Sequence, residues 1–109
     1  MGLNAFNPCG NTVVFSATTS APTPAQAVSS TLGGNQYRVL NSGTVTVFMG
    51  VGTSSSGATS NAAVVSSTGA AIPLLSGTDE IMTFPPNAYF TGITSSGTAV
   101  VYITPGDGL

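Results

Sequence analysis

The chain has 109 residues, the length of one small domain, and 41% of them are hydrophobic, enough to form a core. Only 4% are charged, against roughly 25% in an ordinary soluble domain, and Arg38 is the single basic residue. This composition disfavours nucleic-acid binding, which draws on several Lys or Arg, and the absence of histidine excludes Ser-His-Asp catalysis and the usual zinc ligands.

The first eleven residues show no strand pattern of their own. They carry two large apolar side chains, Leu3 and Phe6, followed by Pro8, among small or polar neighbours. We expect residues 1–11 to form an extended N-terminal arm ahead of a single domain at residues 12–109. The arm is either a loose tail or a segment that docks on a neighbouring chain. In the second case Leu3, Phe6 and Pro8 are the predicted partner contacts.

In the rest of the chain, runs of β-branched residues alternate with short turn segments rich in Gly, Ser, Asn and Pro, and no segment shows helical periodicity. Eight or nine short strands at this spacing predict a sandwich or a barrel. The predicted strands span residues 12–17, 26–31, 36–41, 44–51, 61–66, 70–75, 79–84, 88–94 and 98–104. Because Pro22 and Pro24 cannot donate to a ladder, residues 18–26 are expected to be an extended connection.

One phrase occurs twice. The sequence NSGTVTVFMGVG at residues 41–52 returns as SSGTAVVYITPG at residues 95–106. In each copy Gly is expected to supply a positive φ, and Thr begins an extended run whose alternate residues face a core. The repeat is either a chance recurrence of residues that are common in β-proteins or a pair of equivalent turn-strand units, one in each half of a sandwich.

Candidate chemistry is sparse. The GTSSSG segment at residues 52–57 lacks the Lys and the following helix of a phosphate loop, so it is expected to be a hairpin tip. Arg38 is expected to pair with a carboxylate or to lie at a strand edge. Asp79 and Glu80 would point to opposite faces of a strand, which favours a solvated turn over a carboxylate pair with Asp107 or a calcium site.

The aromatic segment FPPNAYF at residues 84–90 has two interpretations. Its aromatic side chains are either core residues that flank a Pro-Pro turn or a platform that binds a partner or a sugar. In the second case Tyr89 and Phe90 are the predicted contacts.

The C-terminal two thirds of the chain resembles a known family. The residues NSGTVTVFMGVG, followed by IPLLSGTDEIMTFPPNAYFTGITSSGTAVVYITPGDGL, are similar to small capsid decoration, or cement, proteins of tailed bacteriophages. The resemblance covers residues 36–109. It implies a jelly-roll β-sandwich, no catalytic residues and no cofactor. We therefore predict an all-β antiparallel sandwich of jelly-roll type.

The resemblance also implies a function and a place. We expect a structural virion protein, not an enzyme, that binds the major capsid protein on the outside of a phage head and self-associates as a dimer or trimer. The alternative is a glycan- or host-attachment module of a fibre or tail. Assembly in the host cytoplasm agrees with the single cysteine, Cys9, which excludes an internal disulfide. No membrane partner is expected, since no apolar run approaches the roughly 20 residues that span a bilayer.

Overall fold

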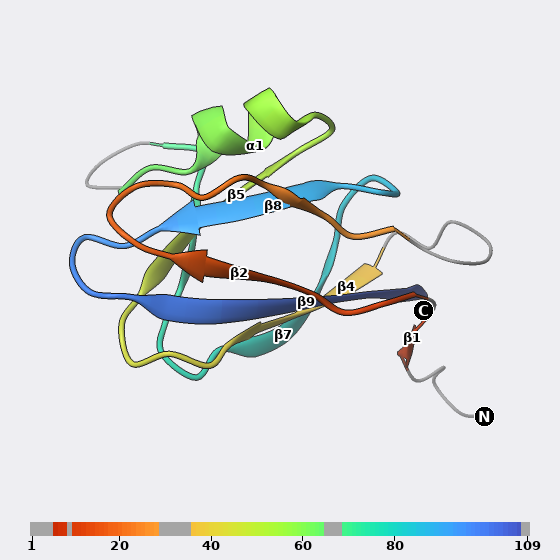
Figure 1. The fold of residues 1–109 in the computed structure, drawn as a ribbon. Coiled ribbons are helices and arrows are strands. Elements are labelled where there is room, and N and C mark those ends of the chain that lie inside the picture. Colours follow the sequence, from red (N-terminus) through yellow and green to blue (C-terminus); the bar gives the residue numbers. More distant parts are fainter. Residues whose placement is uncertain (1–5, 9, 29–35, 65–68, 108–109) are drawn as a thin grey trace.

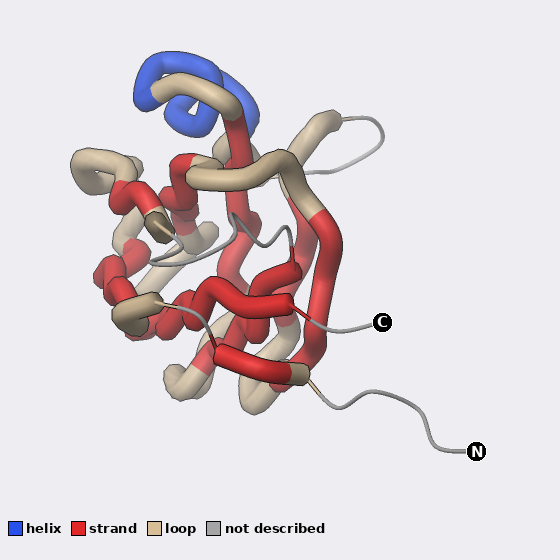
Figure 2. The backbone as a smooth tube through the Cα atoms, turned by 90° about the vertical axis from the view of Figure 1, so that its right-hand side faces the viewer, coloured by secondary structure: helices blue, strands red, loops and turns tan. Residues whose placement is uncertain are grey.

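The computed structural model describes residues 6–8, 10–28, 36–64 and 69–107, which form nine strands and one short helix. The strands lie in two facing antiparallel sheets (Figures 1 and 2), so the predicted all-β sandwich is confirmed. The elements are β1 (Asn7–Pro8), β2 (Val13–Ala17), β3 (Ala25–Gln26), β4 (Gln36–Asn41), β5 (Val47–Gly52), α1 (Ser55–Asn61), β6 (Ile72–Leu74), β7 (Asp79–Thr83), β8 (Tyr89–Ile93) and β9 (Ala99–Asp107).

The strand pairing is that of a rolled-up hairpin. Strand β2 pairs with β9, β3 with β8, β4 with β7 and β5 with β6, all antiparallel. This is jelly-roll order. Pairing of β4 with β9 and of β5 with β8 then completes two sheets. The first sheet has the order β1-β9-β4-β7, with β2 beside β1 on β9, and the second has the order β3-β8-β5-β6.

The core lies between the sheets and is made by alternate residues of their central strands. Tyr37 and Phe90 sit at its centre with ring centroids 5.0 Å apart, edge to face, and Phe84 completes the aromatic group. The Tyr37 hydroxyl donates to the Pro85 carbonyl at 2.7 Å, so the Pro-Pro turn is tied to the core. The fully or almost fully buried apolar residues of this core are Phe15, Ala17, Ala27, Tyr37, Val39, Val47, Met49, Leu74, Ala88, Phe90, Ala99, Val101 and Ile103.

The repeated phrase occupies equivalent places in the two sheets. Each copy carries the chain from one sheet to the other and then enters a central strand, β5 or β9. Val47 and Val101, which align in the repeat, are both fully buried. Of the two turn glycines, only Gly97 has a positive φ, at 80°. Gly43 is instead required because its backbone lies close to Ala99: a Cβ at Gly43 would lie 2.3 Å from the Cβ of Ala99.

The prediction of a hairpin tip followed by a strand at residues 61–66 was wrong. Helix α1 replaces both, residues 62–64 are not in a strand, and residues 65–66 lie outside the described part of the chain. Ser54 caps the helix by accepting a hydrogen bond from the Gly57 N–H at 3.1 Å. The helix packs on β5 where Gly50 has no side chain; a Cβ there would lie 2.3 Å from the Ala58 carbonyl oxygen.

The other predicted strands are found, with shifted ends. Strand β4 has the predicted bounds, β5 begins three residues later than predicted, and β9 continues to Asp107. Strand β3 is Ala25–Gln26, and residues 29–31 of its predicted range lie outside the described residues.

Asn41 ties the two sheets together at the end of β4. Its side chain is fully buried, and its amide donates to the carbonyls of Val45 at 3.0 Å and Leu74 at 2.9 Å, with Leu75 at 3.3 Å. Its side-chain oxygen accepts from the Gly43 N–H at 3.0 Å. A buried polar group is stabilising only when it is hydrogen-bonded in this way. One side chain thus fixes the crossing into β5 and the end of β6.

We expect Asn41→Ala to lower the free energy of unfolding by about 2–4 kcal/mol, because it leaves buried carbonyls without donors at about 1–3 kcal/mol each. Urea denaturation followed by circular dichroism measures the change. The matched control is Asn11→Ala at an exposed position, which should stay within about 0.5 kcal/mol. Equal effects of the two substitutions would contradict the role of Asn41.

Candidate functional site

The outer faces of the two sheets differ in what covers them. On the second sheet, α1 packs over β5 and β8 (Figure 1). Thr91 points outward from β8 and is still fully buried, and its hydroxyl donates to the Pro22 carbonyl at 2.9 Å. No described element packs on the outer face of the first sheet, which forms the lower side of Figure 1. The candidate site is therefore this uncovered face.

Apolar side chains cross the uncovered face from strand to strand. The ladder places Val14 of β2 opposite Tyr102 of β9, and Tyr102 opposite Leu40 of β4. Ile81 of β7 adds a further apolar side chain at the far edge. Val14, Tyr102 and Ile81 are 52%, 41% and 50% exposed, and Leu40 is half-buried. We call Val14, Leu40, Ile81 and Tyr102 the open face.

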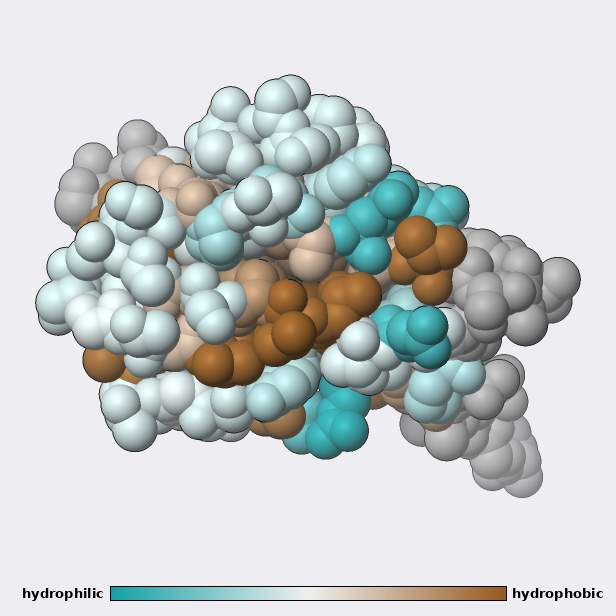
Figure 3. All heavy atoms as spheres, in the orientation of Figure 1, coloured by the Kyte–Doolittle hydropathy of each residue, from teal (hydrophilic) through white to brown (hydrophobic). Residues whose placement is uncertain are grey.

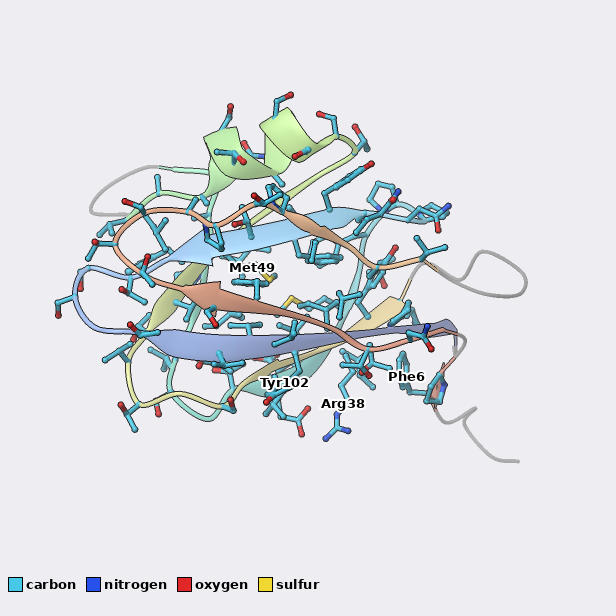
Figure 4. The ribbon with its side chains drawn as sticks, in the orientation of Figure 1. Phe6, Arg38, Met49 and Tyr102 are labelled. Atoms are coloured by element: carbon cyan, nitrogen blue, oxygen red, sulfur yellow. The ribbon has the colours of Figure 1, made fainter. Side chains whose placement is uncertain are left out.

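Figures 3 and 4 show the part of this arrangement that lies over β2 and β9. A band of hydrophobic atoms lies over β2 and β9 in Figure 3. In Figure 4 the side chains of Tyr102 and Arg38 point down, away from the sandwich, whereas Met49 lies between the sheets. Alternation explains the difference, since successive residues of a strand point to opposite faces and the neighbours of Tyr102, Val101 and Ile103, are buried.

An ion pair lies within the open face, between Leu40 and Ile81, because the ladder places Arg38 opposite Ile81 and Asp79 opposite Leu40. Arg38 donates to both carboxylate oxygens of Asp79, from Nε at 2.8 Å and from an η-nitrogen at 2.6 Å. This bidentate hydrogen bonding by Arg38 lowers the pKa of Asp79. The expected pairing of Arg38 with a carboxylate is confirmed, although β4 is a central strand and not an edge. The only basic residue is thus already neutralised within the chain.

The predicted partner contacts fall in different places. Phe6 is half-buried and Pro8 is exposed, and β1, which contains Pro8, pairs with the end of β9 in the same chain. Phe6 lies on the lower side of the first sheet, as Arg38 and Tyr102 do (Figure 4). Leu3 is outside the described residues.

The second group of predicted contacts requires a correction. Tyr89 is half-buried, but Phe90 is fully buried between the sheets, where it packs on Tyr37 and Phe84. Phe90 therefore belongs to the core and does not present its side chain to a partner. The core interpretation of the aromatic segment holds for this residue.

The described residues hold no group of three His, Cys, Asp or Glu side chains close enough to bind a metal ion. Asp79 is engaged by Arg38, and Glu80 is exposed at the beginning of β7. The side chain of Asp107 is outside the described part. No helix within the described ranges is long and apolar enough to cross a membrane.

The described residues form a small jelly-roll sandwich in which one outer face is covered by a described element and the other is not. Comparison of the chain with protein-family models, with curated proteins and with solved structures found no match. Sequence reasoning missed the four residues of the open face. The alternation of residues along each strand could be predicted from the sequence, but the sheet that α1 covers could not.

The Arg38–Asp79 pair predicts a pH dependence. The pKa of Asp79 is lowered in the folded state, so the pair stabilises the fold above the unfolded pKa, about 3.9, and this contribution is lost as the pH falls through the folded value. We expect Asp79→Asn to be less stable than the parent at pH 6, and we expect this difference in stability to disappear at a pH below the folded pKa of Asp79. Denaturation midpoints at both pH values test this, with Glu80→Gln as the control; a difference unchanged at low pH would contradict it.

Proposed function

We propose that this chain is a structural virion protein, an accessory decoration protein that binds the outer surface of a bacteriophage head, stabilises it and has no catalytic role. The observation that carries the proposal is the open face, a sheet surface with apolar side chains exposed across four strands. The phage assignment itself rests on the resemblance of residues 36–109 to decoration proteins. The jelly-roll strand order agrees with what that resemblance implies.

The composition of the open face suits a protein partner. Interface cores are enriched in aromatic residues and depleted in charge, and Tyr102 stands among aliphatic neighbours at the middle of this face. Val14, Tyr102 and Leu40 lie next to one another across β2, β9 and β4. Neighbouring apolar residues of this kind, as opposed to scattered single ones, mark interaction surfaces. Phe6 and Pro8 lie along the same sheet at the end of β9, so the N-terminal arm can extend the contact area.

Tyr102 is the expected anchor of the interface. Replacing a central aromatic anchor costs about 2 kcal/mol or more, which weakens binding roughly 30-fold. We expect Tyr102→Thr to reduce binding to purified heads by that factor and to leave the fold intact, because threonine favours a strand. Co-sedimentation over a range of protein concentrations measures the change.

The matched control for Tyr102 is Leu75→Thr. Leu75 is 66% exposed but lies in the loop after β6, outside the open face. Heads should bind this variant as they bind the parent protein. Binding that falls equally in both variants would mean that the open face is not the contact.

Attachment is expected to resist salt. The chain has one basic and three acidic residues, and Arg38 is already paired with Asp79, so few charges remain for ion pairs with a partner. Raising NaCl from about 0.1 M to about 1 M shortens the Debye length from roughly 10 to 3 Å and should not release the protein, whereas urea should. The fraction that stays with heads after each wash is the measurement. Release by salt alone would show that charges dominate the contact.

A further inference from the structure

The four edges of the sandwich differ in how they are protected. Strand β3 has two residues and follows Pro22 and Pro24, and β6 has three residues with Pro73 in the middle. Edge strand β2 contacts β8 and β3 of the second sheet, and Thr18, directly after it, bridges to Ile93. Short length, proline and coverage are common ways to block an edge.

Within the described part of the chain, strand β7 has none of these protections. It spans five residues without proline, pairs only with β4 among the described residues, and exposes every residue except the half-buried Met82. Strands of an antiparallel ladder turn the main-chain groups of alternate residues to each side. Asn41 donates its N–H to the Thr78 carbonyl at 2.9 Å, so the main-chain groups of Thr78 point toward β4. The main-chain groups of residues 80 and 82, two and four positions further along, therefore also point toward β4. The N–H and C=O groups of Asp79, Ile81 and Thr83 therefore face outward.

We propose that β7 is a self-association edge, where β7 of a second copy of this chain adds antiparallel about a two-fold axis through Ile81. In this register Ile81 hydrogen-bonds to its own counterpart, and Asp79 hydrogen-bonds to Thr83 of the second copy. All three outward-facing residues of each strand are satisfied. The two first sheets join into one continuous sheet.

Charge and length select this register over its neighbours. Moving the axis by one residue, to Glu80, places Glu80 directly opposite Glu80 of the second copy and leaves Thr83 unpaired. Moving the axis to Met82 leaves Asp79 unpaired. With the axis at Ile81, Glu80 faces Met82 of the second copy, and Asp79 is neutralised by Arg38 in its own chain. Like charges directly opposite each other destabilise a sheet, and only the Ile81 register combines full pairing with their absence.

The same axis keeps both open faces on one side. A two-fold axis perpendicular to the joined sheet leaves outward residues outward, so Ile81 of each copy lies beside the other on the joined outer face. The proposal does not depend on a phage partner, since the two copies recognise each other through main-chain groups of β7 that pair with no other described strand.

The first test is the mass of the isolated chain by light scattering. The wild-type protein should have twice the 10.7 kDa of one chain. Ile81→Pro should be a monomer with an unchanged circular dichroism spectrum, because the lost N–H faces outward and not toward β4. Ile81→Thr keeps the main-chain donor and should stay dimeric. A monomeric or trimeric wild type, or a dimer that survives Ile81→Pro, would overturn the proposal.

Cross-linking tests the register without relying on the proline variant. Residues in a hydrogen-bonded antiparallel pair have Cα atoms about 5.5 Å apart, which a disulfide can span. In a Cys9→Ser background, Ile81→Cys should form a covalent dimer on oxidation at least tenfold faster than Val14→Cys. Val14 is a matched control because the two positions are 50% and 52% exposed on the same face. Equal rates would refute the pairing, and head binding is measured separately.

Discussion

The buried carboxamide of Asn41 is the interaction on which the rest of the architecture depends. Apolar packing between two sheets is strong but has no direction, so it does not by itself fix where a strand leaves one sheet for the other. Asn41 supplies that direction because its amide and oxygen meet the β4–β5 crossing and the end of β6 at once. With the end of β4 fixed, its register with β7 and β9 follows.

That register determines the surface. Val39 faces the core and Leu40 faces outward, and a slip of one residue would exchange them and invert the whole first sheet. The second sheet is finished differently: Gly50 and Gly52 leave room for α1, which covers its outer face. The asymmetry between a covered and an uncovered sheet therefore follows from two glycines and one asparagine.

Local patterns were enough to predict β2 and β4–β9, but they missed β1 and predicted a strand at residues 61–66 that the described residues do not form. Strand β4 has its predicted bounds because it ends at the Asn-Ser-Gly turn. Helix α1 was missed because a Ser-rich segment of small residues has no apolar periodicity; its signals are the Ser54 cap and a glycine surface on a strand that packs beneath it. Phe90 was predicted to contact a partner because, in the sequence, an aromatic residue near a Pro-Pro turn looks the same whether it lies on the surface or in the core. The open face required knowledge of what covers each sheet, which is a tertiary property.

The two proposed contacts use different chemical groups, and this allows them to act together. Edge pairing at β7 consumes main-chain donors and acceptors, whereas head binding uses the side chains around Tyr102, so neither contact occupies the other. If both proposals hold, a dimer with both open faces on one side would bind a shell through two linked sites, and the second contact would form at a high effective concentration. Each face can then bind weakly while the pair holds firmly. For a chain with so few charges, shape and hydrogen bonding in the proposed arrangement would replace electrostatic attraction as the source of affinity.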